Sequence, residues 1–277
     1  MPLFKEMLNS DETLFLNPQF LDLDFQPKVV PYRENQQHYI ADCIKPLLQR
    51  RSGKNILITG KCGVGKTVCL RHVLKELNDE YGDDIYCLYV NCWKKDTPFK
   101  IITELCLQLG YSWTHNKSYD ELVKTVVELI NKKSAVIVFD EIDKLQDQSI
   151  LYTLSEDLYR KQFIMITNAH DFLVNIDGRV RSRLSLDIIE FKPYNLGQIS
   201  GILKERLEYA FIKNCFTKDA FEIICSKTHE LEDVRTGLFL MKESAELAET
   251  KSSRKIELIH SQEAIKKLID FKTKNVE

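Results

Sequence analysis

Residues 60–67 form the glycine-rich loop GKCGVGKT, which follows the apolar run 55–59 and precedes a helix-forming run. A strand, a GxxxxGK[ST] loop and a helix in this order are the context in which the pattern binds nucleotide phosphates. Glycine allows the tight backbone path that points successive N–H groups at phosphate oxygens. The sequence therefore predicts a nucleoside triphosphate site, with a chance match in an ordinary turn as the alternative.

Two side chains of this loop carry specific chemistry. Lys66 is expected to reach the β- and γ-phosphates, and the Thr67 hydroxyl is expected to ligate Mg²⁺. The helix that follows, from Val68 to Leu77, directs its positive end at the anion. The predicted cofactors are ATP or ADP with Mg²⁺, and the predicted binding residues are Gly60, Lys61, Cys62, Gly63, Val64, Gly65, Lys66, Thr67 and Val68.

Composition excludes several other classes of protein. A chain of 277 residues with 44% hydrophobic and 29% charged residues is typical of a globular protein with one large or two modest domains. Apolar runs such as 135–139 are too short to span a bilayer, so no membrane partner is expected. The eight cysteines form no CxxC pair and indicate buried apolar thiols rather than metal ligands. A net charge of −2 confines any nucleic-acid contact to a local patch.

Strand and helix signals alternate from about residue 54 to 191, which predicts an α/β domain with a parallel sheet between helices. A helix, Glu34–Arg50, precedes the first strand. The five predicted strands are 54–59, 85–91, 134–139, 162–167 and 187–191. Helical patterns alone follow, at 196–213, 217–228, 234–249 and 261–271. We therefore expect an α/β domain at 1–192, with an insertion at 94–133, and a small helical domain at 193–277.

Two acids and an amide follow predicted buried strands. Asp140 and Glu141 come after the run AVIVF, at the strand end where ligands of open α/β sheets bind. Asp140 is expected to hold the Mg²⁺ shell and Glu141 to polarise the attacking water. Asn168 follows the next strand, where a neutral amide can bridge that water and the γ-phosphate. Helix capping by the acids and an ordinary turn at Asn168 are the alternatives.

In order, these features resemble the AAA+ ATPases, and most closely the origin-recognition and Cdc-type replication initiators of archaea and eukaryotes. The resemblance covers nearly all of the chain. It is carried by PYRENQQ at 31–37, the loop at 60–67, NCWKKDTPFKIITELCLQLG at 91–110, VFDEID at 138–143, ITNAHDF at 166–172 and DGRVRSRL through FKPY at 177–194. It implies an AAA+ P-loop fold with a helical lid. Such initiators carry a winged-helix domain after the lid, which we do not expect within these 277 residues.

The resemblance also implies site residues beyond the loop. Pro31, Tyr32 and Arg33 match the segment that flanks the adenine, and Tyr194 matches the aromatic residue at the hinge to the lid. Asn168 matches the sensor 1 position. Arg235 matches the sensor 2 arginine, although the family usually has glycine where this chain has Glu232. Ordinary loop packing is the alternative for Tyr194.

Arg183 and, as second choice, Arg179 match the segment that supplies an arginine finger to a neighbouring subunit. Such a finger contributes about 10³- to 10⁵-fold in related enzymes, so a lone monomer is expected to hydrolyse ATP slowly. Other AAA+ subunits or replication proteins are therefore the implied protein partners. Three arginines within 179–183 are also typical of a solvated surface.

The insertion 94–133 resembles the element with which initiators grip duplex DNA, and we expect weak to moderate DNA binding there. Tyr111 and Trp113 are the aromatic candidates, and the candidate phosphate ligands are Lys94, Lys95, Lys100, Lys117 and Lys124. Neighbouring acids make a solvated helical hairpin an equal alternative.

The leading hypothesis is an ATP-binding and ATP-hydrolysing switch for origin recognition or helicase loading, cytoplasmic at the nucleoid or nuclear in a eukaryote. The alternatives are an AAA+ ATPase of a mobile element or defence system that acts with a nuclease or transposase, and a binding module locked on ADP. The intact Glu141 argues against the locked module.

Overall fold

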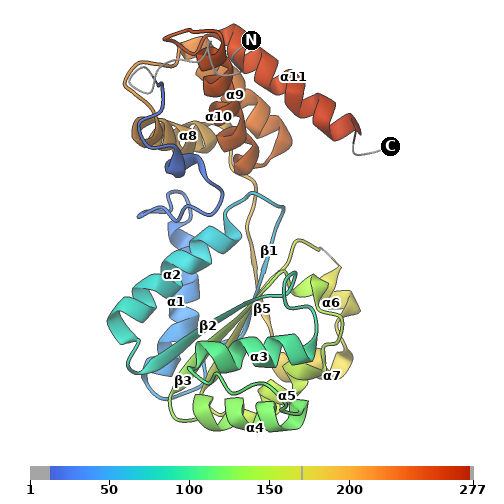
Figure 1. The fold of residues 1–277 in the computed structure, drawn as a ribbon. Coiled ribbons are helices and arrows are strands. Elements are labelled where there is room, and N and C mark those ends of the chain that lie inside the picture. The colour runs from blue at the N-terminus through green and yellow to red at the C-terminus, as the bar shows by residue number, and fades with distance from the viewer. Residues whose placement is uncertain (1–12, 170, 275–277) are drawn as a thin grey trace. The chain divides into compact units, whose positions relative to one another are not determined.

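The computed structural model describes residues 13–169 and 171–274, which form two units (Figure 1). The first is an α/β unit that contains residues 27–60 and 65–192. The second is a helical unit that contains the described residues from 13 to 26, residues 61–64 and the chain from Pro193 onward. No described helix is long and apolar enough to cross a membrane.

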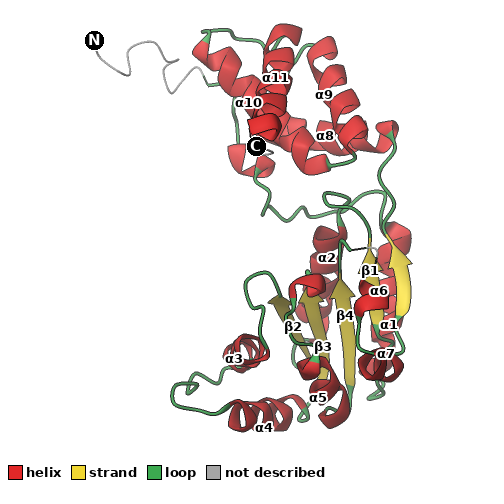
Figure 2. Cartoon of the chain, turned by 90° about the vertical axis from the view of Figure 1, so that its right-hand side faces the viewer, coloured by secondary structure: helices red, strands yellow, loops and turns green. Residues whose placement is uncertain are grey.

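The α/β unit is built on a five-stranded parallel sheet with strand order β2-β3-β4-β1-β5 (Figure 2). The strands are β1 (Ile56–Thr59), β2 (Ile85–Asn91), β3 (Ser134–Asp140), β4 (Lys161–Ile166) and β5 (Asp187–Glu190). The predicted fold class, a parallel sheet of five strands between helices with a helical lid, is confirmed. β3 is buried along its whole length, as expected for a strand covered on both faces.

The first strand begins at Ile56, two residues later than predicted. The backbone N–H of Lys54 instead bonds to the carbonyl of Cys43, and the Asn55 side chain bonds to the Leu184 carbonyl and to the N–H of Phe163. Lys54 is thus bonded outside the sheet. Asn55 contacts both neighbouring strands, because its carbonyl also accepts from the Asp187 N–H of β5 at 3.0 Å.

Helices cover both faces of the sheet. Their bounds are α1 (Glu34–Leu48), α2 (Lys66–Tyr81), α3 (Pro98–Gln108), α4 (Tyr119–Ile130), α5 (Ser149–Asp157), α6 (Phe172–Asn175) and α7 (Gly178–Leu184). Alternate residues of β3, Ala135, Ile137 and Phe139, share one core with α3, α4, α5 and α7. α1 and α2 lie on the opposite face (Figure 2). Right-handed crossovers require this split, because the chain moves across the sheet in opposite directions after β1 and after β2.

The first helix ends at Leu48, two residues before the predicted end. Arg50 has a φ of 57°, in the left-handed region, which a continuing right-handed helix cannot contain. By contrast, α2 is longer than predicted at its C-terminal end and stops at Tyr81.

The insertion at 94–133 contains α3 and α4, which contact each other. Its apolar residues Ile101, Ile102, Leu105, Leu122 and Val126 are fully buried in the core of the α/β unit. These two helices are therefore integral to the fold, and only their outer side chains are available to a partner.

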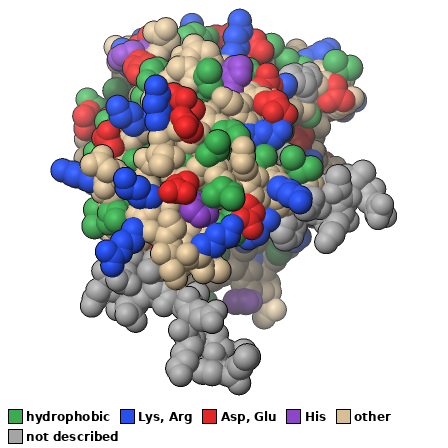
Figure 3. Space-filling model, turned by 90° about the horizontal axis from the view of Figure 1, so that it is seen from above, with side chains coloured by type: hydrophobic (Ala, Val, Ile, Leu, Met, Phe, Trp, Pro, Cys, Tyr) green, Lys and Arg blue, Asp and Glu red, His purple; other side chains and the backbone are tan. Residues whose placement is uncertain are grey.

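The helical unit contains α8 (Leu196–Ala210), α9 (Lys218–Leu231), α10 (Val234–Thr250) and α11 (Leu258–Lys274). All four were predicted, with ends that differ by a few residues. Asp233 caps α10, because its side chain accepts a hydrogen bond from the Arg235 N–H at 2.9 Å. On the face that Figure 3 shows, basic and acidic side chains are interspersed, so this face carries no patch of a single sign.

The α/β unit ends at Lys192 and the chain from Pro193 onward lies in the helical unit, which also contains the described residues from 13 to 26. Leu14 and Leu21 are buried in the core of the helical unit. The Leu16 N–H donates to the Ala210 carbonyl at 2.8 Å, and the Phe15 and Phe211 rings lie 5.1 Å apart. Burial of these apolar side chains outweighs closeness in sequence, and it joins residues 13–26 to the second unit.

Candidate functional site

The turn after β1 has the backbone path that the glycines were expected to allow. Gly60 has a φ of 142°, and a Cβ there would lie 2.4 Å from the carbonyl oxygen of Phe191. Gly65 has a φ of 88° and immediately precedes α2. Residues with a Cβ rarely adopt either conformation, so the loop keeps its shape only with glycine at these positions.

Lys66 begins α2 and is buried, with 6% of its surface exposed. Its ammonium donates to the Gly60 carbonyl at 2.6 Å and to Oδ1 of Asn168 at 2.7 Å. A buried ammonium needs such acceptors, and phosphate oxygens are stronger ones. The lysine of the loop and the predicted sensor amide are therefore neighbours.

Thr67 and Asp140 also lie together, since the Thr67 hydroxyl donates to Oδ2 of Asp140 at 2.9 Å. The other carboxylate oxygen of Asp140, Oδ1, accepts from the N–H of Glu141 at 3.0 Å. Asp140 is the last residue of β3 and is buried. The structure thus joins the end of β3 to the first turn of α2, as the Mg²⁺ prediction requires.

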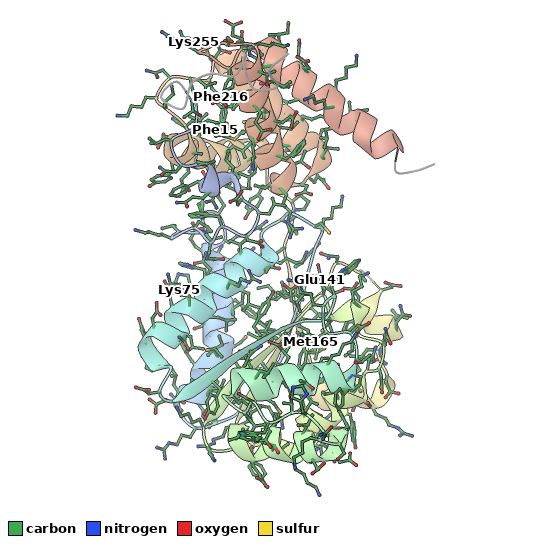
Figure 4. All side chains as sticks on the ribbon, viewed as in Figure 1. Phe15, Lys75, Glu141, Met165, Phe216 and Lys255 are labelled. Atoms are coloured by element: carbon green, nitrogen blue, oxygen red, sulfur yellow. The ribbon has the colours of Figure 1, made fainter. Side chains whose placement is uncertain are left out.

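Glu141 has a φ of 55°, a left-handed conformation that is uncommon for a residue with a side chain. It precedes the short 3-10 helix η3 (Ile142–Lys144), but its side chain makes no capping hydrogen bond there. Figure 4 shows Glu141 at the end of the sheet, whereas Met165 lies within it. The capping alternative therefore lacks support at Glu141, and the strained backbone is typical of functional positions.

Tyr89 completes this network and was not among the site residues predicted from the sequence. Its hydroxyl donates to Oδ2 of Asp140. Burial and the nearby Asp140 carboxylate raise the pKa of the Tyr89 phenol, which therefore stays a protonated donor near neutral pH. Its sequence context, IYCLYVN, matches that of any aromatic residue in a strand, so only the register of β2 against β3 reveals it.

The residues present fit a magnesium nucleotide. Hydroxyl and carboxylate oxygens are the ligands that Mg²⁺ accepts, and Thr67 and Asp140 would supply them. Lys66 supplies positive charge near Gly60 and Gly65, which place no side chain of their own between the backbone and a phosphate.

The residues expected to flank the adenine have different environments. Tyr32 is 40% exposed and has a φ of 63°, and Pro31 precedes it in the same turn. Arg33 is buried, and its guanidinium donates to the Lys192 carbonyl at 2.6 Å and lies 5.1 Å from the Phe191 ring centroid. The Arg33 side chain thus joins the start of α1 to the segment that follows β5.

In the helical unit, Tyr194 is buried in the core, and its role at the hinge stays a prediction. Arg235 is exposed in the first turn of α10. Glu232 forms an ion pair with Lys61, and both residues belong to this unit. A Cβ on Gly63 would clash with the Asp233 carboxylate. Glu232 has a φ of 54°, which explains why glycine is usual at this position.

The arginine-rich helix α7 holds its three arginines differently. Arg183 lies 3.4 Å from Glu156 and 5.7 Å from the Tyr152 ring centroid. The Arg181 guanidinium donates to the Leu173 carbonyl at 3.3 Å. Arg179 is exposed, and the structure gives its guanidinium no ion pair among the described residues. The arginine finger therefore stays a prediction for Arg183 and Arg179.

Of the lysines predicted to contact DNA, three are paired with acids. The pairs are Lys95 with Glu104 at 3.1 Å, Lys100 with Asp96 at 2.7 Å, and Lys117 with Glu121 at 2.9 Å. Lys94 and Lys124 are exposed and form no salt bridge within the described chain. Trp113 is 81% exposed, whereas Tyr111 packs against the core.

Comparison with known proteins identifies the family. Residues 49–173 match the AAA domain model, and residues 200–266 match the Cdc6 AAA+ ATPase-type lid domain. The ORC1-type DNA replication protein 1 of Sulfurisphaera tokodaii is 32% identical over 271 residues, which cover 92% of this chain and 67% of that protein. This chain belongs to the ORC1-type DNA replication proteins. The predicted resemblance to origin-recognition and Cdc-type initiators is confirmed.

Other ORC1-type proteins match with similar coverage. The ORC1-type DNA replication protein 1 of Archaeoglobus fulgidus is 30% identical over 285 residues, covering 97% of this chain and 69% of that protein. The ORC1-type DNA replication protein of Methanocorpusculum labreanum is 30% identical over 285 residues, which cover 93% of this chain and 66% of that protein. The chain thus spans about two thirds of the length of its ORC1-type relatives.

The solved structures agree with this ORC1-type assignment. The Aeropyrum pernix ORC1 protein, solved in complex with DNA, is 27% identical with a TM-score of 0.82, covering 94% of this chain and 71% of that one. The Cdc6p of Pyrobaculum aerophilum shares the fold, with a TM-score of 0.77 at 21% identity. The match covers 88% of this chain and 69% of that one.

Proposed function

We propose that this chain is an ATP-dependent switch of the DNA replication initiator type, which binds ATP with Mg²⁺ and hydrolyses it slowly. The observation that carries the proposal is the pair of contacts from α2, Thr67 to Asp140 at 2.9 Å and Lys66 to Asn168 at 2.7 Å. These four residues come from three separate motifs. They meet at the carboxyl ends of adjacent strands, where α/β sheets bind nucleotides.

The roles follow from the chemistry of each side chain. Lys66 neutralises charge on the β- and γ-phosphates, and Thr67 and Asp140 hold the Mg²⁺ shell. Bound Mg²⁺ would neutralise charge that develops on the transferred phosphoryl group. Glu141 orients and polarises the attacking water, and Asn168 bridges that water and the γ-phosphate without adding charge.

Arg235 and a neighbouring subunit complete the proposed switch. Arg235 would sense the nucleotide from the helical unit, and Tyr32 and Pro31 would flank the adenine. Arg183, or Arg179, would act in trans on the nucleotide of an adjoining AAA+ subunit. The exposed pair between Arg183 and Glu156 does not oppose this role, because such pairs contribute only about 0–1 kcal/mol.

Duplex DNA is the proposed nucleic-acid partner. Support comes from the similar Aeropyrum pernix ORC1 protein, which was solved with DNA. In this chain, Trp113, Lys94 and Lys124 are the best placed side chains of the insertion, since the other lysines are paired with acids. With few free cations, the contact would be weak and strongly dependent on salt.

Single-turnover hydrolysis by the wild type and by Glu141→Gln tests the proposal. Loss of a general base lowers rates by about 10²- to 10⁴-fold, so the variant should bind ATP normally and hydrolyse it at least about 100-fold more slowly. Equal rates would instead support a module locked on ADP. Nucleotide extracted from the native protein and identified by mass spectrometry separates the same two cases.

A further inference from the structure

The carboxylate of Asp140 is almost fully engaged by donors of the protein itself. Oδ2 accepts from the Thr67 hydroxyl and from the Tyr89 hydroxyl, and Oδ1 accepts from the Glu141 N–H. A carboxylate offers about four lone-pair positions, two on each oxygen. Three are occupied in this way, so one acceptor position, on Oδ1, is left by the donors of the described chain.

Tyr89 is held firmly in place by its surroundings. It lies in β2, opposite Val138 of β3, two residues before the pair formed by Asn91 and Asp140. The Arg71 guanidinium lies 4.9 Å from the centre of its ring. Arg71 is one turn after Thr67 on α2, so the same helix that supplies Thr67 also clamps the tyrosine.

We propose that Tyr89 is a positioning residue for magnesium, whose hydroxyl fixes the rotation of the Asp140 carboxylate and so determines which oxygen faces the metal shell. This inference rests on the proposed nucleotide-dependent function. Without the tyrosine hydroxyl, Oδ2 would keep the Thr67 hydroxyl as its one donor among the described residues. The carboxylate, still bonded through Oδ1 to the Glu141 N–H, would then be less tightly fixed in its rotation about the Cβ–Cγ bond. Partners of this kind that orient metal ligands typically change metal affinity by about 10- to 100-fold when they are removed.

A merely structural role makes a different prediction. Phenylalanine fills nearly the same volume as tyrosine and would keep the contact with Arg71, so packing alone should survive the substitution. Only an effect through Asp140 should appear as a loss of Mg²⁺ affinity without a loss of metal-free nucleotide binding.

The experiment compares Tyr89→Phe with the wild type by titrating MgCl₂ against a fluorescent ATP analogue, with a parallel measurement in EDTA. We expect the apparent Mg²⁺ affinity to fall about tenfold or more, while affinity in EDTA and the thermal midpoint stay close to those of the wild type. Tyr86→Phe is the matched control, because Tyr86 lies on the same strand with its ring against Lys133. Unchanged or tighter Mg²⁺ affinity in Tyr89→Phe would overturn the inference.

Lys66→Ala separates this inference from the proposed function. If Lys66→Ala binds the analogue as tightly as the wild type, the nucleotide site itself is wrong. If Lys66→Ala no longer binds the analogue but Tyr89→Phe has the Mg²⁺ affinity of the wild type, the nucleotide site stands and the role of Tyr89 is refuted.

Discussion

Lys66 and Asn168 are 102 residues apart in the chain, yet the Lys66 ammonium donates to the Asn168 side-chain oxygen at 2.7 Å. The sheet brings them together, because β1 and β4 are parallel neighbours with Ile58 opposite Ile166. Lys66 also donates to the Gly60 carbonyl. The ammonium is therefore held by acceptors of the protein, which the phosphates must replace in part when a nucleotide binds.

This contact predicts distinct effects for two substitutions of Asn168. Asn168→Ala should keep ATP affinity within a few fold and lower single-turnover hydrolysis by about 100-fold, because one preorganised polar group is lost. Asn168→Asp should weaken ATP binding more than ADP binding, since a carboxylate pairs with Lys66 and repels the γ-phosphate. Equilibrium binding and rapid-quench assays measure both effects, with Asn175→Ala of α6 as the control. An Asp variant that binds both nucleotides equally well would contradict the assignment.

Cys62 lies in the phosphate-binding loop and is the exposed free cysteine of the described chain. Burial raises the pKa of Cys69 and Cys92 to about 12 and that of Cys87, Cys215 and Cys225 to about 11. At pH 8 a thiol of pKa about 12 is roughly one part in ten thousand thiolate, so these side chains react slowly. Native protein should therefore incorporate one equivalent of N-ethylmaleimide, at Cys62, and ATP with Mg²⁺ should block it. Mass spectrometry of the labelled peptides measures this, and label at Cys62 that ATP does not reduce would oppose the site.

Glu232 ends α9 with a φ of 54°, a conformation that costs about 1–2 kcal/mol for a residue with a Cβ. Its ion pair with Lys61 is exposed, at 38% and 59% for the two side chains, and contributes only about 0–1 kcal/mol. Glu232→Gly and Glu232→Ala both remove the ion pair, but only glycine relieves the backbone. We therefore expect the glycine variant to be more stable than the alanine variant by about 1 kcal/mol in urea unfolding. Equal stabilities would mean that the left-handed backbone carries no measurable cost.

An arginine finger acting in trans predicts that ATP turnover per chain rises with protein concentration. Arg183→Ala should abolish this rise, with a loss of about 10³-fold or more in the assembled state and little effect on monomer binding of ATP. Arg179→Ala is the matched comparison, because it removes an arginine from the same helix. Steady-state assays over a wide concentration range make the measurement. A rise that survives in Arg183→Ala and disappears in Arg179→Ala would reassign the finger.

Trp113 is 81% exposed, so its replacement by alanine should leave the thermal midpoint unchanged. If the insertion binds duplex DNA, Trp113→Ala should weaken binding by about 2 kcal/mol, the loss typical of a tryptophan that anchors an interface. Lys124→Ala should reduce the slope of the logarithm of the binding constant against the logarithm of salt concentration by about one. Lys117→Ala should reduce this slope by less, because Glu121 already neutralises Lys117. Fluorescence anisotropy at several salt concentrations distinguishes these outcomes. Unchanged affinity in both Trp113→Ala and Lys124→Ala would remove the insertion as a DNA contact.

The order of secondary structure could be predicted from the sequence because its signals are local. The apolar runs that form β1, β3 and β4 and the glycine loop before Lys66 each depend on neighbouring residues only. The positions of Asp140 and Asn168 followed as well, because parallel strands end on one edge of a sheet. The predicted start of β1 and the predicted end of α1 were less accurate. The side-chain bond of Asn55 and the left-handed backbone of Arg50 override the apolar periodicity there.

The sequence alone determined that a strand, a phosphate-binding loop and two strand-end acids occur in an order that an ORC1-type fold requires. Only the tertiary structure decided that residues 13–26 join the helical unit, that Lys95 pairs with Glu104, and that Tyr89 bonds to Asp140. Periodicity and motifs report contacts within one turn or strand. These three outcomes depend instead on which distant side chains meet when apolar surface is buried, and no local pattern encodes that choice.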